Sequence, residues 1–258
     1  MRKLVFITGA SSGIGQALAW RCYQAGYDLA LVARRVHEMQ QWAEAHRLDA
    51  ARYRLYAADV ADVPSIVAAG QACLAQQGLP DVVVANAGIS IGMDTAQHED
   101  LAVMARTFAV NNTGLAATFH PFIAPMRLRG SGRLVGVASV AGIRGLPGHG
   151  AYCASKAGVI SYCESLRGEL RGSGVRVVTL APGYIKTPLT QQNRYPMPFL
   201  MPAPVFAERA LKAIEAGVSY RVIPWQMGVA AKLLRLLPDA LFDRLLAGRP
   251  RKHRVSSL

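Results

Sequence analysis

Short apolar runs alternate with helical patterns along most of the chain. The first run, Leu4 to Ile7, is followed after a turn by apolar residues at helical spacing through Ala17, Leu18 and Cys22. Strands alternating with helices require right-handed crossovers, so the pattern predicts an α/β fold with a Rossmann-like, doubly wound parallel sheet in a single domain, residues 1–223. We expect strands near residues 3–8, 28–33, 53–58, 81–85, 132–138, 174–180 and 219–223.

The pattern becomes purely helical in residues 224–258. Apolar residues recur at helical spacing from Trp225 to Leu246, with a break at Pro238, and this predicts two amphipathic helices. Seven basic and two acidic residues give this C-terminal extension +5 of the net charge of +13. Three roles stay open: a cover over a substrate site or a neighbouring subunit, a peripheral contact with a membrane surface, and a solvated face.

A glycine-rich turn joins the first strand to the first helix. Residues 8–15 read Thr-Gly-Ala-Ser-Ser-Gly-Ile-Gly, a spacing different from the common G-x-G-x-x-G. Glycines allow a pyrophosphate to approach the backbone, and a helix N-terminus offers N–H donors and a positive dipole. The order of strand, glycine-rich turn and helix therefore predicts a dinucleotide site.

The end of the second expected strand indicates which dinucleotide binds. An NAD site places a carboxylate there to bond the ribose 2′-hydroxyl, but this chain has Ala33. Arg34 and Arg35 follow, and a guanidinium matches the geometry of a 2′-phosphate. We therefore predict that the chain prefers NADP(H) over NAD(H).

Tyr152 and Lys156 lie four residues apart, so on a helix both side chains project from one face. A nearby ammonium favours the phenolate and lowers the phenol pKa. A tyrosine in this setting can exchange protons near neutral pH. An isolated pair of this kind is more typical of a solvated helix face, so its meaning depends on the other motifs.

Residues 3–223 resemble the short-chain dehydrogenases/reductases, because the family's motifs occur in the family's order. The usual N-N-A-G motif is altered here, since Ala85 replaces its first Asn. The motifs are T-G-x-x-x-G-x-G at residues 8–15; Asp59-Val60, which matches the family's acidic residue at the adenine ring; Asn86-Ala87-Gly88, which resembles the motif that steadies the central sheet; Asn111; Ser139, located 13 residues before Tyr152; and P-G-x-x-x-T at residues 182–187. The resemblance implies seven strands in the order 3-2-1-4-5-6-7.

The resemblance also implies catalysis in which a ketone or aldehyde and an alcohol are interconverted by hydride transfer. Tyr152 would exchange the proton and Ser139 would position the substrate oxygen. Lys156 would lower the Tyr152 pKa and bond the nicotinamide ribose, and Asn111 would hold a relay water. The expected cofactor contacts are Gly9, Ser11, Ser12, Gly13, Ile14, Gly15, Arg34, Arg35, Asp59, Val60, Asn86, Ala87, Gly88, Tyr152, Lys156, Pro182, Gly183, Ile185 and Thr187.

Apolar residues in the expected loops favour a hydrophobic carbonyl substrate. The stretch from Tyr195 to Pro202 covers the substrate in the family, although the same side chains could simply pack a lid against the body. The expected substrate contacts are Ile143, Leu146, His149, Tyr184 and Leu189.

Composition narrows the class of protein. With 258 residues and 52% hydrophobic content the chain can bury one large core, and no apolar run approaches the roughly 18 residues of a membrane helix. The four cysteines lack metal-site spacing, so we expect reduced thiols, no metal and a cytoplasmic location.

The high positive charge raises a second class, a protein that binds nucleic acid or an acidic partner. The basic residues are spread along the chain without a nucleic-acid motif, so no nucleic-acid partner is expected. Some relatives have lost the catalytic tetrad and act as sensors, whereas all four residues are present here. The resemblance further implies a homodimer or homotetramer through helices beginning near Gly114 and Ala151.

Overall fold

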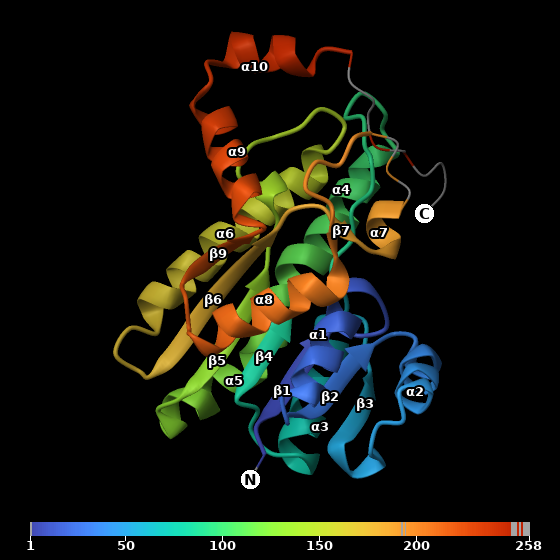
Figure 1. Ribbon diagram of the computed structural model, residues 1–258, viewed down its shortest axis with the longest axis vertical. Coiled ribbons are helices and arrows are strands. Elements are labelled where there is room, and N and C mark those ends of the chain that lie inside the picture. The colour runs from blue at the N-terminus through green and yellow to red at the C-terminus, as the bar shows by residue number, and fades with distance from the viewer. Residues whose placement is uncertain (1, 192, 194, 249–251, 253, 255–258) are drawn as a thin grey trace.

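The computed structural model describes residues 2–191, 193, 195–248, 252 and 254. One sheet of seven parallel strands runs through the molecule in the order β3-β2-β1-β4-β5-β6-β9, which confirms the predicted fold and strand order (Figure 1). The strands are β1 (Leu4–Thr8), β2 (Asp28–Ala33), β3 (Tyr53–Ala57), β4 (Val82–Ala85), β5 (Gly132–Val137), β6 (Val175–Pro182) and β9 (Tyr220–Ile223).

Helices cover both faces of the sheet because successive strand side chains point to opposite sides. In β1, Val5 and Ile7 enter one core and Leu4 and Phe6 the other. The first core lies under α1 (Gly13–Gln24), α2 (Val36–Ala45) and α8 (Ala203–Glu215). The second lies under α3 (Val63–Gln76), α5 (Gly114–Arg129) and α6 (Gly150–Glu169), with α4 (Asp100–Phe108) packing beside α6.

Two local features were not predicted from the sequence. A π-helical turn, Ala109–Thr113, joins α4 to α5 and carries Asn111. A second sheet pairs β7 (Ile185–Lys186) with β8 (Met201–Pro202) and frames the segment that contains α7 (Pro188–Gln191). Strands of two residues are too short to leave a period in the sequence, so this pairing depends on tertiary contacts.

The extension forms the two predicted helices, α9 (Trp225–Leu236) and α10 (Asp239–Leu246), separated at Pro238. They lie beyond the main body of the sheet, at the top of the molecule in Figure 1. Leu233 and Leu236 of α9 are exposed. Arg249 and Arg251 of the basic extension lie outside the described residues. Among the helices that are described, none is both long and apolar enough to cross a membrane.

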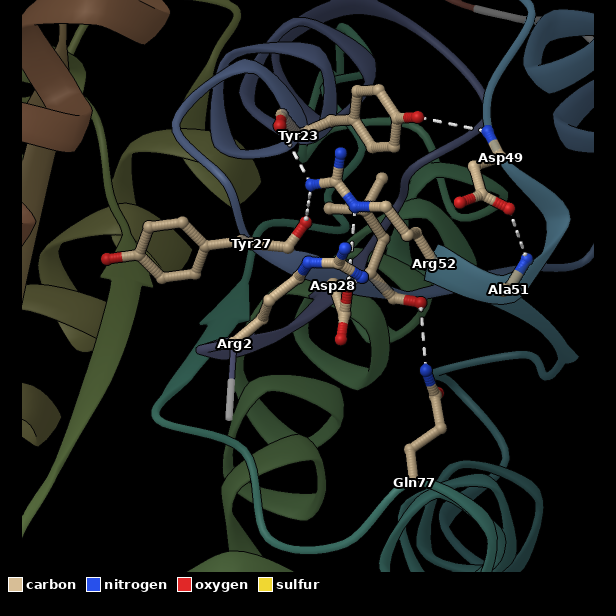
Figure 2. Close-up of polar contacts among 9 residues, drawn as sticks. Arg2, Tyr23, Tyr27, Asp28, Asp49, Ala51, Arg52 and Gln77 are labelled. Atoms are coloured by element: carbon tan, nitrogen blue, oxygen red, sulfur yellow. Dashed lines mark hydrogen bonds and ion pairs between the residues drawn. The ribbon is translucent and has the colours of Figure 1, made fainter.

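Arg52 fastens the carboxyl end of α1 to the start of β2 (Figure 2). Its Nη2 donates to the carbonyl of Tyr27 at 2.8 Å and of Tyr23 at 3.1 Å, and its Nε lies 3.5 Å from an Asp28 carboxylate oxygen. The guanidinium carbon also lies 3.9 Å from the centroid of the Tyr23 ring. Since α1 begins directly after the glycine-rich turn, Arg52 fixes the far end of the helix that presents this turn.

Replacing Arg52 by Met is expected to destabilise the fold. The side chain is only 16% exposed, and hydrogen bonds to a charged group each contribute about 1.5–3 kcal/mol, so we expect a loss of that order in the free energy of unfolding. Arg54→Met removes an exposed guanidinium two residues along and should change the free energy by less than about 0.5 kcal/mol. Urea unfolding followed by circular dichroism measures both, and equal losses would contradict the anchoring role.

Candidate active site

A cavity of about 490 Å³ runs along the carboxyl ends of the central strands. Open parallel sheets bind ligands at this edge, near the point where the strand order reverses between β1 and β4. Every residue expected to contact the cofactor lines this cavity except Gly15. Gly15 is buried in the first turn of α1, and a Cβ there would lie 2.3 Å from the Gly9 carbonyl oxygen. Gly15 therefore permits α1 to pack against the turn.

The turn itself requires glycine at two positions. Gly9 and Gly13 have φ values of +67° and +59°, in the left-handed region that other residues rarely adopt. A Cβ at Gly9 would also lie 2.9 Å from the Cα of Ala87, on the segment that follows β4. The first turn of α1 contains no acidic residue, so the positive end of its dipole faces the cavity uncompensated. These features fit the pyrophosphate of a dinucleotide.

Thr8 joins the turn to the motif Asn86-Ala87-Gly88. Its Oγ1 accepts hydrogen bonds from the backbone N–H of Asn86 at 3.1 Å and of Ala87 at 3.2 Å. The side chain of Asn86 donates to the Thr8 carbonyl at 2.9 Å. These contacts join the ends of β1 and β4. The motif's expected role in steadying the central sheet stays a prediction.

Two guanidinium groups lie at the end of β2. Arg34 Nη1 is 3.6 Å from Asp59 Oδ2, and both side chains are largely exposed. Arg35 forms an ion pair with Glu38 at 2.9 Å and donates to Ser11 Oγ at 3.4 Å. β2 itself ends in Ala33 and contributes no carboxylate here. The preference for NADP(H) over NAD(H) stays a prediction.

Asn111 and Lys156 face each other across Gly88. A Cβ built on Gly88 would lie 3.2 Å from Asn111 Oδ1 and 3.3 Å from Lys156 Nζ. Asn111 accepts from the Ile89 N–H at 2.9 Å and donates to the Ile89 carbonyl at 3.0 Å. It also donates to Ser155 Oγ at 2.9 Å. Asn111 thus ties the segment after β4 to α6, and its role in holding a relay water stays a prediction.

Tyr152 has a raised pKa, opposite to the lowering expected from Lys156. Burial of the phenol is the main cause, and a hydrogen bond with Ser139 lowers the pKa by less. Lys156 Nζ lies 5.9 Å from the centre of the Tyr152 ring and donates to the Val137 carbonyl at 2.8 Å. Burial lowers the pKa of Lys156 to about 8. The low-dielectric surroundings thus disfavour both charged forms.

A second cavity, of about 960 Å³, adjoins the first. Ser139 and Tyr152 line both, so these two residues lie where the two cavities meet. Of the expected substrate contacts, Leu146, His149, Tyr184 and Leu189 line the second cavity.

Ile143 is not among the described residues that line this cavity, and its assignment as a substrate contact stays a prediction. The chain forms a short 3-10 turn after Ser139, and the Ile143 N–H closes it by donating to the Val140 carbonyl at 3.0 Å. The loop was placed correctly from the sequence, but loop position does not determine which of its side chains line a cavity.

His149 is buried in the wall of this second cavity. Its Nδ1 lies 3.2 Å from the Pro147 carbonyl oxygen and its Nε2 lies 3.3 Å from the Tyr195 hydroxyl. Burial lowers the pKa of His149 and raises the pKa of Tyr195 to about 12. Both groups are therefore neutral and polar at physiological pH.

The C-terminal extension forms part of the wall of the second cavity. The sequence alone had left three roles open for this extension. The apolar sides of α9 and α10, together with a later lysine, line the second cavity. The lining residues from the extension are Met227, Ala230, Ala231, Leu234, Phe242, Leu246 and Lys252. The amphipathic period of both helices was the signal for a buried face, but it did not indicate what that face covers.

Arg144, which sequence reasoning missed, attaches the extension to the loop between Ser139 and Tyr152. Its side chain is 10% exposed. Nη1 donates to the carbonyls of Leu234 and Leu237, at the end of α9, and Nη2 lies 2.9 Å from Asp239 Oδ1 at the start of α10. The guanidinium also stacks on Phe242, 3.7 Å from its centroid. A lone arginine in a loop carries no local sequence signal for such distant partners.

Within the described part of the chain, no three His, Cys, Asp or Glu side chains gather in a way that would hold a metal. All four cysteines are buried and free.

Comparison with known proteins shows the family to which the chain belongs. A family model described as short chain dehydrogenase matches residues 3–197. An uncharacterized oxidoreductase of Myxococcus xanthus is 37% identical, over 93% of this chain and 95% of that protein. The 2-(R)-hydroxypropyl-CoM dehydrogenase of Xanthobacter autotrophicus is 34% identical, over 74% of this chain and 78% of that enzyme.

Among solved structures, a 3-ketoacyl-(acyl-carrier-protein) reductase from Brucella melitensis, complexed with NADH, has a TM-score of 0.76 and 27% identity. The match covers 85% of this chain and 95% of that one. The family match, the relatives and the seven-stranded sheet together show that this chain belongs to the short-chain dehydrogenase/reductase family, whose members use a nicotinamide cofactor to oxidise alcohols or reduce carbonyl compounds.

Proposed function

We propose that this protein uses NADPH to reduce the carbonyl group of a largely apolar ketone or aldehyde to an alcohol. The observation that supports this most is the position of Ser139 and Tyr152, which line both cavities. A carbonyl carbon held beside these hydroxyls would also adjoin the cavity that fits a dinucleotide. The nicotinamide supplies the hydride, and the protein supplies position and a proton.

Tyr152 is the proposed proton donor and Ser139 the group that positions the substrate oxygen. Because burial raises the Tyr152 pKa, the phenol stays protonated at neutral pH, as reduction requires. When the proton leaves, the phenolate gains stability from the nearby Lys156 ammonium, which is charged below its pKa of about 8. Asn111 holds the backbone that faces Lys156.

NADPH is the proposed cofactor because of the charges at the end of β2. Arg34 and Arg35 line the cavity, and β2 contributes no acid that would select a free 2′-hydroxyl. The Arg34–Asp59 contact, at 3.6 Å and largely exposed, is weak enough for Arg34 to turn to a phosphate. Asp59 is then free to contact the adenine ring.

The proposed role of the extension is to form the outer wall of the substrate cavity. The apolar side chains of α9 and α10 exclude water from a site that contains a developing charge. The homodimer or homotetramer implied by the family, a cytoplasmic location and a peripheral membrane contact all stay predictions. Size-exclusion chromatography with light scattering tests the oligomer, and liposome sedimentation tests the membrane contact.

Tyr152→Phe should abolish turnover while NADPH binding is retained. The substitution removes the proton donor and keeps the ring, and loss of an acid–base group costs roughly 10²–10⁴-fold in rate. Initial rates with a panel of ketones measure the loss, and quenching of NADPH fluorescence reports cofactor binding. A variant that retains the wild-type rate would exclude Tyr152 as the donor.

Arg34→Ala should raise the KM for NADPH far more than the KM for NADH. A charge-assisted contact to a phosphate contributes roughly 10–100-fold to binding, and NADH lacks that phosphate. NADH with the same variant is the internal control. If KM rises equally for NADPH and NADH, the residue that selects the cofactor lies elsewhere.

Arg144→Met should weaken the binding of bulky ketones, because α9 and α10 lose their attachment to the catalytic loop. We expect KM for a bulky ketone to rise on the order of tenfold, with a smaller change for a short aldehyde. Arg235→Met, which removes an exposed charge from α9, is the matched control. Equal KM changes for the bulky and the short substrate would argue against a wall formed by the extension.

A further inference from the structure

The charged side chains that line the substrate cavity are all basic among the described residues. Arg144 and Lys252 line it, and no described Asp or Glu does. Arg144 is already paired with Asp239 and with the carbonyls at the end of α9. His149 is neutral because burial and the nearby Lys252 charge both lower its pKa. Among the described residues of this wall, Lys252 is therefore the cation that has no acidic partner.

The described contacts of Lys252 leave its charge without a carboxylate. Its Nζ donates to Ser90 Oγ at 2.9 Å, and no ion pair joins it to an acidic side chain of the described residues. An ammonium has three N–H donors, and a serine hydroxyl satisfies one. Lys252 is partly buried, which lowers its pKa to about 8. Burial of an unmatched charge is unfavourable, so an anion at this position would stabilise it.

Arg254 holds this end of the chain against the body. Its Nε lies 2.6 Å from Asp100 Oδ2, and the Asp100 side chain is only 3% exposed. The Asp94 N–H also donates to Asp100, which fixes the carboxylate. In addition, Arg254 forms a parallel β-bridge with Gly92. With Arg254 fastened two residues later, Lys252 is presented at the cavity wall beside Ser90.

We propose that the substrate is a carbonyl compound with an apolar body and an anionic group, and that Lys252 binds this anion. The proposal rests on the carbonyl reduction proposed above and defines its substrate class. The apolar body would contact Met227, Leu234 and Phe242, while the carbonyl lies at Ser139 and Tyr152. A carboxylate, a phosphate and a sulfonate share the chemistry that an ammonium recognises.

The test compares a medium-chain keto acid, whose ketone is at the far end from its carboxylate, with its methyl ester. The two share a carbon skeleton and differ in charge. Wild-type protein should have the higher kcat/KM for the acid, mainly through KM. In Lys252→Met the ratio of acid to ester should fall roughly 10–100-fold, because the variant keeps the chain length and loses the charge.

Lys232→Met is the matched control, since it removes the same charge from an exposed position of the extension and should keep the ratio. Lys252→Arg should keep much of the preference for the acid. Circular dichroism and NADPH binding confirm that each variant folds. If Lys252→Met lowers kcat/KM equally for the acid and the ester, the proposal is overturned and Lys252 only fastens the chain to Ser90. Equal kcat/KM values for the acid and the ester in the wild-type protein would also overturn it.

A binding measurement separates this proposal from the proposed reaction. Calorimetry with decanoate and methyl decanoate, in the presence of NADPH, reports on Lys252 without any turnover. Tighter binding of decanoate that is lost in Lys252→Met supports the anion site even if no carbonyl is reduced, in which case only the proposed reaction fails. Equal binding of decanoate and its ester overturns the anion site while the reduction can still stand.

Discussion

The side chain of Thr8 holds together the two strands between which the order of the sheet reverses. Its hydroxyl oxygen accepts hydrogen bonds from two backbone N–H groups of the segment after β4. The side chain of Asn86 in turn donates a hydrogen bond to the Thr8 carbonyl. The glycine-rich turn depends on this contact, because Gly9 packs against Ala87 too closely for a side chain. Gly15 in turn brings α1 onto Gly9. The cavity that fits the dinucleotide is therefore a consequence of how β1 and β4 are joined.

The proposed reacting groups and part of the proposed substrate cavity come from different parts of the chain. Residues 3–197, which match the family, contain Asn111, Ser139, Tyr152 and Lys156. The extension lies beyond that match and contributes much of the outer wall of the larger cavity. Arg144 couples the two parts, because it lies in the loop between Ser139 and Tyr152 yet bonds to the ends of both extension helices. In the proposed reaction, the extension would therefore shape the substrate cavity, while the proposed reacting groups all lie in the part that matches the family.

Sequence reasoning succeeded where the signal is local. The strands follow from continuous apolar runs, and the cavity residues after β1 and β4 follow from short motifs at fixed positions of a parallel sheet. It failed where the outcome depends on tertiary structure. The Arg144 contact with the Leu237 carbonyl, for example, joins residues that are 93 positions apart in the chain. The Tyr152 pKa was misjudged because the spacing to Lys156 shows a neighbouring charge but says nothing of burial.

The most direct test of a carbonyl reductase is to follow the hydride itself. NADPH that carries deuterium at the transferred position of C4 can be incubated with the protein and a panel of ketones and aldehydes. The account predicts an alcohol product with deuterium on the former carbonyl carbon, detected by mass spectrometry. Oxidation of the labelled NADPH without deuterium in any alcohol, or no oxidation with any carbonyl compound under conditions where NADPH binds, would contradict it.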